Sequence, residues 1–167
     1  MQRPSNLDRI GPALRQAAIS AGLAGALVLA LAGVGLAHVT VWPKASTVGA
    51  WEKYTLRVPT ERDVPTVSVT LRMPAGVEFE QYRPLPGWSV TTKKDAQHRV
   101  TLVTWTATDG GLAPGQFQEF EFVAKNPAAP GAVAWDAFQT YKGGEIVEWT
   151  GNEGSQTPHS LTEITAK

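Results

Sequence analysis

Residues 51–58 have the sequence Trp-Glu-Lys-Tyr-Thr-Leu-Arg-Val, in which apolar and polar side chains alternate. Alternation with a period of two is typical of a β-strand that buries one face and exposes the other. Residues 66–73, Thr-Val-Ser-Val-Thr-Leu-Arg-Met, repeat the pattern. The two stretches predict successive amphipathic strands, and they set the fold class.

Further strands are predicted on both sides of this pair. They cover residues 38–42, 87–91, 99–107, 116–124, 132–141, 145–149 and 160–165. Turn-forming stretches such as Asp109-Gly110-Gly111 and Lys142-Gly143-Gly144 separate them. Short strands spaced by roughly 8–12 residues are typical of sandwiches and barrels. We therefore predict an all-β domain, an antiparallel β-sandwich of immunoglobulin-like or cupredoxin-like type.

Residues 1–37 have the composition of a secretory signal peptide. The first part is arginine-rich, and residues 17–37 carry no charge. A basic start, an apolar run and small residues at Gly35 and Ala37 fit cleavage between Ala37 and His38. Residues 38–167 would then be the exported domain, periplasmic or secreted. An uncleaved membrane anchor is the alternative, because the apolar run is close to the length of about 20 residues that spans a bilayer.

The composition of residues 38–167 limits the possible partners. Removing the three arginines and one aspartate of residues 1–37 from 15 basic and 15 acidic residues leaves 12 and 14, a balance of minus two. A nucleic-acid partner is not expected, because it would require a clustered basic face. No second apolar span follows residue 37, so we expect the mature form to be soluble and not membrane-spanning.

Cleavage after Ala37 would make His38 the first residue of the processed protein. A free α-amine titrates near about 7.7–8.0 and an imidazole near about 6.5, so both become available as neutral donors at little proton cost near neutral pH. The two nitrogens of one residue can chelate a single metal ion. Cleavage one residue away would remove this chelate. We predict that His38 is a metal ligand created by processing.

The other histidines give weaker signals. His98 and His159 both lie in polar stretches and are expected to be exposed loop residues. The chain has no Gly-x-Ser-x-Gly motif, no phosphate-binding glycine loop and no His-Glu-x-x-His pair. Hydrolase and nucleotide-binding functions are therefore not expected.

A series of short motifs runs through the domain in a fixed order. They are Ala37–Pro43, Val58–Thr66, Pro84–Trp88, Trp105, Leu112–Phe117 and Trp135–Tyr141. Together they resemble the YcnI-like family of bacterial copper-binding proteins over essentially the whole domain. The resemblance implies an exported β-sandwich, encoded near copper-import genes, which binds Cu(II) through a single-histidine brace. We expect the protein not to be an enzyme. We predict that it passes Cu(II) to, or receives it from, an envelope copper chaperone or copper importer.

The same resemblance implies a site with one histidine, one carboxylate and one tryptophan. At the matching positions these are His38, Glu61 and Trp135. Asp63 in the same turn competes with Glu61, and Glu52 is a more distant competitor.

The strand expected at residues 132–141 would place Trp135 on the same face as Gln139 and Tyr141. A core position is the usual role of a tryptophan in a sandwich. Because this face mixes polar and aromatic groups, we also consider it as the wall of a metal site.

Nitrogen and oxygen ligands suit tetragonal Cu(II). The chain has no cysteine, and Met73 is the only methionine after residue 37. A blue-copper site and a methionine-rich Cu(I) site are thus excluded, and bound copper should be oxidised.

Two other functions remain open from the sequence. A copper monooxygenase-like enzyme would need a second histidine, which only His98 or His159 could supply. A metal-free interaction module of an envelope complex would use His38 only as the start of an edge strand.

Overall fold

The computed structural model describes residues 38–167, which contain strands and turns but no helix. The strands are β1 (Thr40–Trp42), β2 (Ala45–Thr47), β3 (Trp51–Pro59), β4 (Thr66–Arg72), β5 (Glu78–Tyr82), β6 (Trp88–Lys94), β7 (Val100–Ala107), β8 (Phe117–Lys125), β9 (Gly131–Trp135), β10 (Ala137–Tyr141), β11 (Ile146–Trp149) and β12 (Ser160–Thr165).

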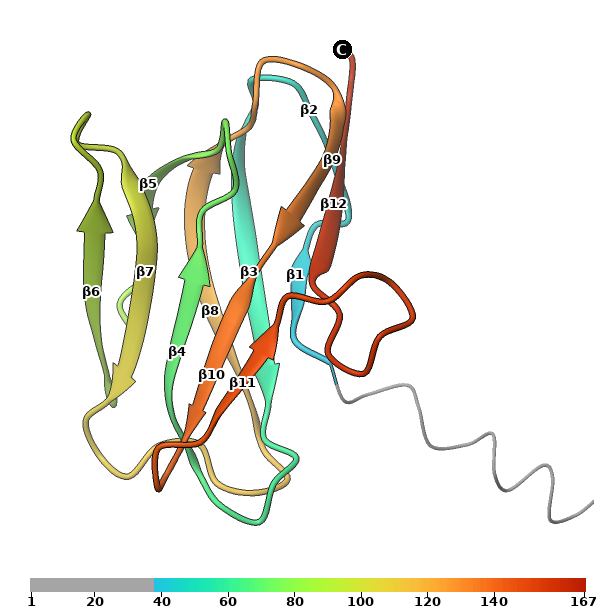
Figure 1. Cartoon of the computed structure of the whole chain (residues 1–167). Coiled ribbons are helices and arrows are strands. Elements are labelled where there is room, and N and C mark those ends of the chain that lie inside the picture. Colours follow the sequence, from blue (N-terminus) through green and yellow to red (C-terminus); the bar gives the residue numbers. More distant parts are fainter. Residues whose placement is uncertain (1–37) are drawn as a thin grey trace, which may run out of the picture. The chain divides into compact units, whose positions relative to one another are not determined.

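Two antiparallel sheets face each other and form a sandwich (Figure 1). One has the strand order β1-β3-β8-β5 and the other the order β11-β10-β4-β7-β6. A smaller sheet, β2-β12-β9, includes the parallel pair β2–β12. The predicted all-β sandwich is therefore confirmed, with one parallel pairing in addition.

The core lies between the two larger sheets. Tyr54, Leu56 and Val58 of β3 are fully buried, as the alternation in residues 51–58 predicts. From the opposite sheet, Val69 and Leu71 of β4 are fully buried as well. Burying such side chains contributes roughly 1.5–3 kcal/mol each, so the period-two pattern is the main determinant of the fold.

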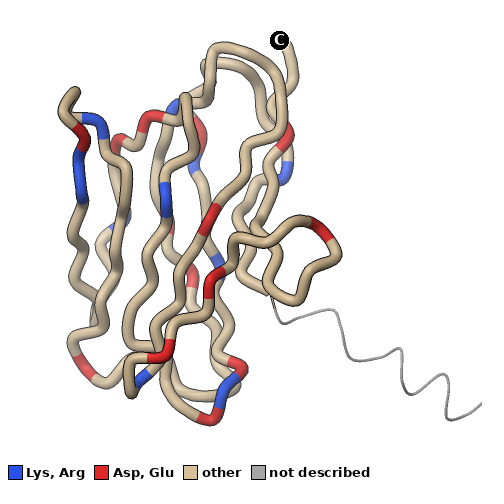
Figure 2. The backbone as a smooth tube through the Cα atoms, in the orientation of Figure 1, with Lys and Arg blue, Asp and Glu red and all other residues tan. Residues whose placement is uncertain are grey.

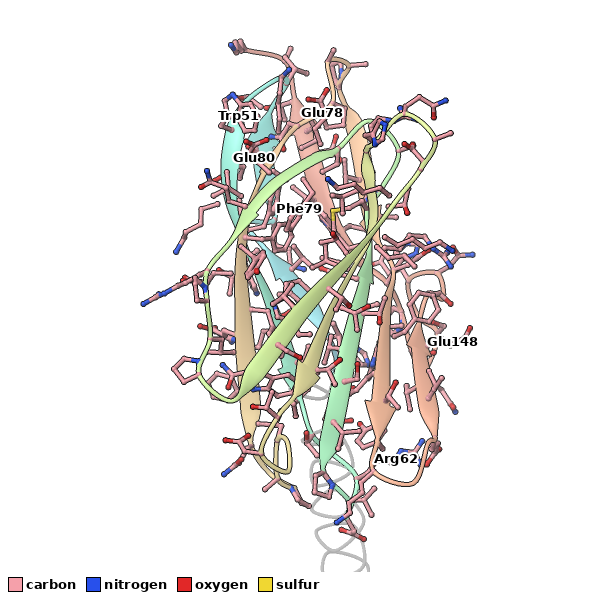
Figure 3. All side chains as sticks on the ribbon, turned by 90° about the vertical axis from the view of Figure 1, so that its left-hand side faces the viewer. Trp51, Arg62, Glu78, Phe79, Glu80 and Glu148 are labelled. Carbon is pink, nitrogen blue, oxygen red and sulfur yellow. The ribbon has the colours of Figure 1, made fainter. Side chains whose placement is uncertain are left out.

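The structure contains two strands that the sequence pattern does not predict. β2 has three residues, too few to show a period. β5 is an edge strand with the sequence Glu-Phe-Glu-Gln-Tyr, in which Phe79 is the only residue that is not exposed. Glu78 and Glu80 precede and follow Phe79 in the strand, and Figure 3 shows both glutamates above Phe79. The Phe79 ring stacks on Phe122 of the core at 5.9 Å.

The strand predicted over residues 132–141 is divided in the structure. β9 pairs with β12, whereas β10 pairs with β4 and β11, so the chain passes from one sheet to another at Asp136. The inward-facing residues Val133, Trp135 and Ala137 keep their alternation through this break. Hydrophobic period alone therefore gives no sign of the change of sheet.

A β-bulge interrupts the pairing of β4 with β10. Thr140 faces Ser68, but the next residue, Tyr141, faces Thr66, which leaves Val67 as the extra residue. The bulge reverses the expected positions of the first two side chains of β4, so Thr66 is fully buried and Val67 is only half-buried.

Charged residues of both signs are interspersed along the strands and turns (Figure 2). Several form ion pairs between neighbouring strands, such as Arg57 with Glu119 at 2.8 Å and Lys53 with Glu121 at 2.8 Å. Within residues 38–167, no helix is long and apolar enough to cross a membrane. The leader expected at residues 1–37 lies outside the described residues.

Candidate metal centre

His38 is held at the start of β1 by the residues that follow it. Val39 and Val41 are buried in the core, and the Val41 N–H donates to the Ser160 hydroxyl at 2.8 Å. β1 also pairs with β3, with Val41 opposite Leu56. These contacts fix the half-buried His38 at the edge of the sheet.

The ring of His38 lies against the indole ring of Trp149. Their centroids are 5.7 Å apart, and the ring planes are tilted by 59°. Trp149 is the last residue of β11 and lies opposite Ala137 of β10. Trp149 is only 4% exposed, so its indole is held by the packing around it.

Glu61 begins the turn that follows β3. The preceding residue, Thr60, is buried, and its N–H donates to the Gln116 carbonyl at 2.8 Å. Glu61 itself is exposed, yet partial burial of its carboxyl group raises its pKa. The positive charge of His38 acts in the opposite direction and lowers the same pKa. Glu61 and His38 are thus close enough to interact electrostatically.

Tyr141 lies beneath the Glu61 turn. Burial raises the pKa of its hydroxyl, and the positive charge of Arg62 opposes that rise. Arg62 lies over the Tyr141 ring at 5.6 Å and forms an ion pair with Glu145 at 2.9 Å. The turn is therefore attached to the β10–β11 hairpin that carries Trp149.

The structure places Trp135 in the hydrophobic core. It is 1% exposed and contacts Tyr54 and Phe122 at centroid distances of 4.8 and 5.7 Å. Its indole N–H donates to the Thr162 hydroxyl at 3.0 Å. The tryptophan that lies beside the His38 ring is Trp149. The role of Trp135 in a metal site stays a prediction, and its core position is the one usual for a tryptophan in a sandwich.

Sequence reasoning missed Trp149 although it predicted the strand at residues 145–149. Period-two patterns show which face a tryptophan occupies, but not which distant residue that face meets. The turn at residues 142–144 was the one local signal for the position of Trp149. It predicts a hairpin, and the pairing of that hairpin places Trp149 opposite the small residue Ala137.

The other candidate ligands each have surroundings of their own. Glu52 accepts a hydrogen bond from Ser46 at 2.6 Å, and Asp63 is exposed. His98 is an exposed turn residue with a φ of 61°, and His159 Nδ1 faces Asp136 Oδ1 at 3.8 Å.

Among residues 38–167, no three histidine, aspartate or glutamate side chains are close enough to hold a metal ion. His38 and Glu61 therefore offer only two side-chain ligands. A free α-amine on His38 would supply a third donor and complete a nitrogen and oxygen set, which is suited to copper.

Comparisons with known proteins agree with this chemistry. Residues 38–164 match the family model described as "Domain of unknown function (DUF1775)". The chain is 57% identical over 130 residues to the copper-binding protein CutI of Bacillus subtilis (strain 168). The match covers 78% of this chain and 63% of that protein, so the chain spans less than two thirds of its relative.

Solved structures share the fold. An uncharacterized protein from Nocardia farcinica, described as immunoglobulin-like, superposes with a TM-score of 0.67 at 31% identity, covering 77% of this chain and 98% of that one. A cohesin module from a Clostridium perfringens family 33 glycoside hydrolase gives 0.51 at 10% identity, covering 78% and 99%. At that low identity, the likeness to the cohesin concerns the fold alone.

Proposed function

Because the chain belongs to the DUF1775 family, the family of the YcnI-like proteins, we propose that it binds copper and holds Cu(II) at His38, Glu61 and Trp149. One observation carries the proposal. The His38 ring packs on Trp149 while its charge acts on Glu61. The identity to CutI supports copper as the metal.

The proposed ligands are the α-amine and imidazole of His38 and the carboxylate of Glu61. The amine becomes available only after cleavage between Ala37 and His38, so the proposal includes export and removal of the leader. Glu61 is favoured over Asp63 and Glu52 because it is the carboxyl group whose pKa responds to the charge of His38.

Trp149 is proposed as the wall of the site. Its indole face can attract a metal cation through the ring quadrupole, and it excludes water from one side of the ligands. Since Trp149 is almost fully buried, its orientation is set by the protein and does not depend on the metal.

The biological role that fits this site is copper trafficking in the cell envelope, with a copper chaperone or importer as the partner. With His38 and Glu61 as ligands, an open coordination position remains for a ligand from that partner. We propose a carrier and not an enzyme, because no third histidine or carboxylate among residues 38–167 joins His38 and Glu61 in a metal-holding group. His159 faces Asp136, and His98 is an exposed turn residue.

The proposal is tested by a copper titration of the processed protein. The chain is produced with its own leader in an exporting host, and mass spectrometry verifies that it begins at His38. Electron paramagnetic resonance should show one Cu(II) with nitrogen ligands, and tryptophan fluorescence should be quenched with the same stoichiometry.

Two variants serve as controls for this titration. A protein that starts at Ala37 keeps every side chain but locks the His38 amine in a peptide bond, so its copper affinity should fall by about tenfold or more. His38→Ala should bind still more weakly. Full affinity in His38→Ala would refute the proposed site, because copper would then bind elsewhere in the chain. Failure of the processed wild-type protein to bind copper would favour the metal-free interaction module.

A further inference from the structure

Gln139 is a fully buried amide on the inward face of β10. Burying an amide costs free energy unless its polar atoms are paired. Here both ends of the amide have partners. Its Oε1 accepts from the Trp149 indole N–H at 3.1 Å, and its Nε2 donates to the Pro59 carbonyl at 2.8 Å and to the Thr66 hydroxyl at 2.7 Å.

These partners belong to the two halves of the candidate metal centre. Trp149 lies against His38, and Pro59 is the last residue of β3, two residues before Glu61. One side chain therefore connects the tryptophan wall to the backbone that carries the carboxylate.

The network continues into the Glu61 turn through Thr66. The hydroxyls of Thr66 and Thr60 are 2.8 Å apart, and Thr60 also donates to the Leu112 carbonyl at 3.3 Å. Thr66 reaches this position because the bulge at Val67 turns it inward. Bulges of this kind often re-aim a side chain beside a functional site.

We infer that Gln139 is a positioning residue of the metal centre, an inference that rests on the proposed copper function. It fixes the plane of the Trp149 ring and the start of the Glu61 turn before copper arrives. Without it, the indole N–H would be buried without a partner, and the ring and the turn could move independently. Partners of metal-site residues typically change metal affinity by about 10–100-fold when they are replaced.

Asn126 provides a matched control. It is also a buried amide, whose Oδ1 accepts from the Tyr54 hydroxyl at 2.6 Å and whose Nδ2 donates to Ser46 at 2.8 Å and to the Thr47 carbonyl at 2.9 Å. Asn126 directly follows the last residue of β8, whereas the first residue of β8 pairs with Pro59, which accepts a hydrogen bond from Gln139. The length of β8 therefore separates the two amides by roughly 25–30 Å. Figure 3 shows the two ends of the sandwich. Trp51 marks the end at which Asn126 lies, and Arg62 marks the end with the Glu61 turn.

The experiment compares Gln139→Met with Asn126→Leu in the full chain after natural processing. Each change replaces a buried amide by an apolar side chain of similar length. Both should lower the thermal midpoint. Only Gln139→Met should weaken copper binding, by about tenfold or more, and change the copper hyperfine splitting and the quenching of tryptophan fluorescence. Thr66→Val, which removes one link of the network, is the second variant if Gln139→Met does not fold, and its affinity should fall less.

Each outcome supports or overturns the inference. Wild-type copper affinity and spectra in Gln139→Met, or in Thr66→Val where that variant is the one that folds, would overturn the positioning role while leaving the copper function intact. Equal loss of affinity in Asn126→Leu would also overturn it, because the effect would then reflect general destabilisation. Failure of the unmodified processed protein to bind copper would overturn the proposed function and this role together.

Discussion

At the scale of single residues, the pKa of the Glu61 carboxyl group is the property that depends on its neighbours in the candidate site. Partial burial raises the pKa of its carboxyl group, and the charge of His38 opposes that rise. Copper needs the deprotonated carboxylate. A raised pKa therefore means that protons compete with copper for Glu61 at a higher pH than they would for a free glutamate.

We predict that His38→Ala raises the pKa of Glu61 further. The charge of the imidazole favours the ionised carboxylate, so its removal leaves only the effect of burial. Carboxyl carbon shifts followed by NMR during an acid titration of the metal-free protein would measure this. A lower or unchanged pKa of Glu61 in the variant would show that the two residues do not interact.

The sequence predicted some of the residues of this site and not others, for physical reasons. His38 stands out because its chemistry depends on its position in the chain, not on the fold. Trp135 and Trp149 both lie on inward faces of strands, and local pattern treats them alike. Only the pairing of β10 with β11 and the course of β1 bring Trp149 to His38.

At the scale of elements, the Glu61 turn is supported by a close approach between two segments. Leu112 and Thr66 exchange backbone hydrogen bonds of 2.9 Å in both directions. Gly111 precedes Leu112 with a φ of 86°, and a Cβ placed there would overlap the Thr66 carbonyl oxygen. Glycine at this position lets the β7–β8 connection reach the start of β4.

Gly111→Ala and Gly110→Ala should therefore differ in stability. Both residues have positive φ values, 86° and 93°, so both variants bear a backbone strain of about 1–2 kcal/mol. A methyl group on Gly110 would have no neighbour within 4 Å, whereas one on Gly111 must displace Thr66. We expect Gly111→Ala to lose about 1–3 kcal/mol more than Gly110→Ala in urea unfolding. Equal losses would show that the close approach is unimportant.

Elements with a regular pattern were predicted well, and the irregular ones were not. β3 and β4 follow from alternation over seven or more residues. The change of sheet at Asp136 and the bulge at Val67 arise from pairing between distant strands, so the local sequence carries no mark of them.

At the scale of the whole molecule, the candidate site brings together three segments that are far apart in the sequence. His38 precedes β1, Glu61 follows β3 and Trp149 ends β11. A ligand that binds only the folded protein stabilises it by about 2.7 kcal/mol at a concentration one hundred times its dissociation constant. Copper should therefore act on global unfolding and not on a single hairpin.

We predict that Cu(II) at that excess raises the thermal midpoint of the processed protein by several degrees. The protein that starts at Ala37 should show a much smaller rise at the same copper concentration, because it lacks the α-amine. Differential scanning calorimetry measures both. An equal rise in the two proteins would point to a copper site elsewhere in the chain.

The edge strand β5 has a consequence for how the protein behaves in solution. Its outer edge presents unpaired backbone groups, which in other sheets recruit a second chain and start fibrils. Two features oppose this here: the pairing with β8 shifts register between Phe79 and Gln81, and Glu78 and Glu80 flank the one apolar anchor. A strand from a second chain would have to pair with an irregular edge and would lie beside the negative charges of Glu78 and Glu80. We therefore expect β5 to oppose aggregation along this edge.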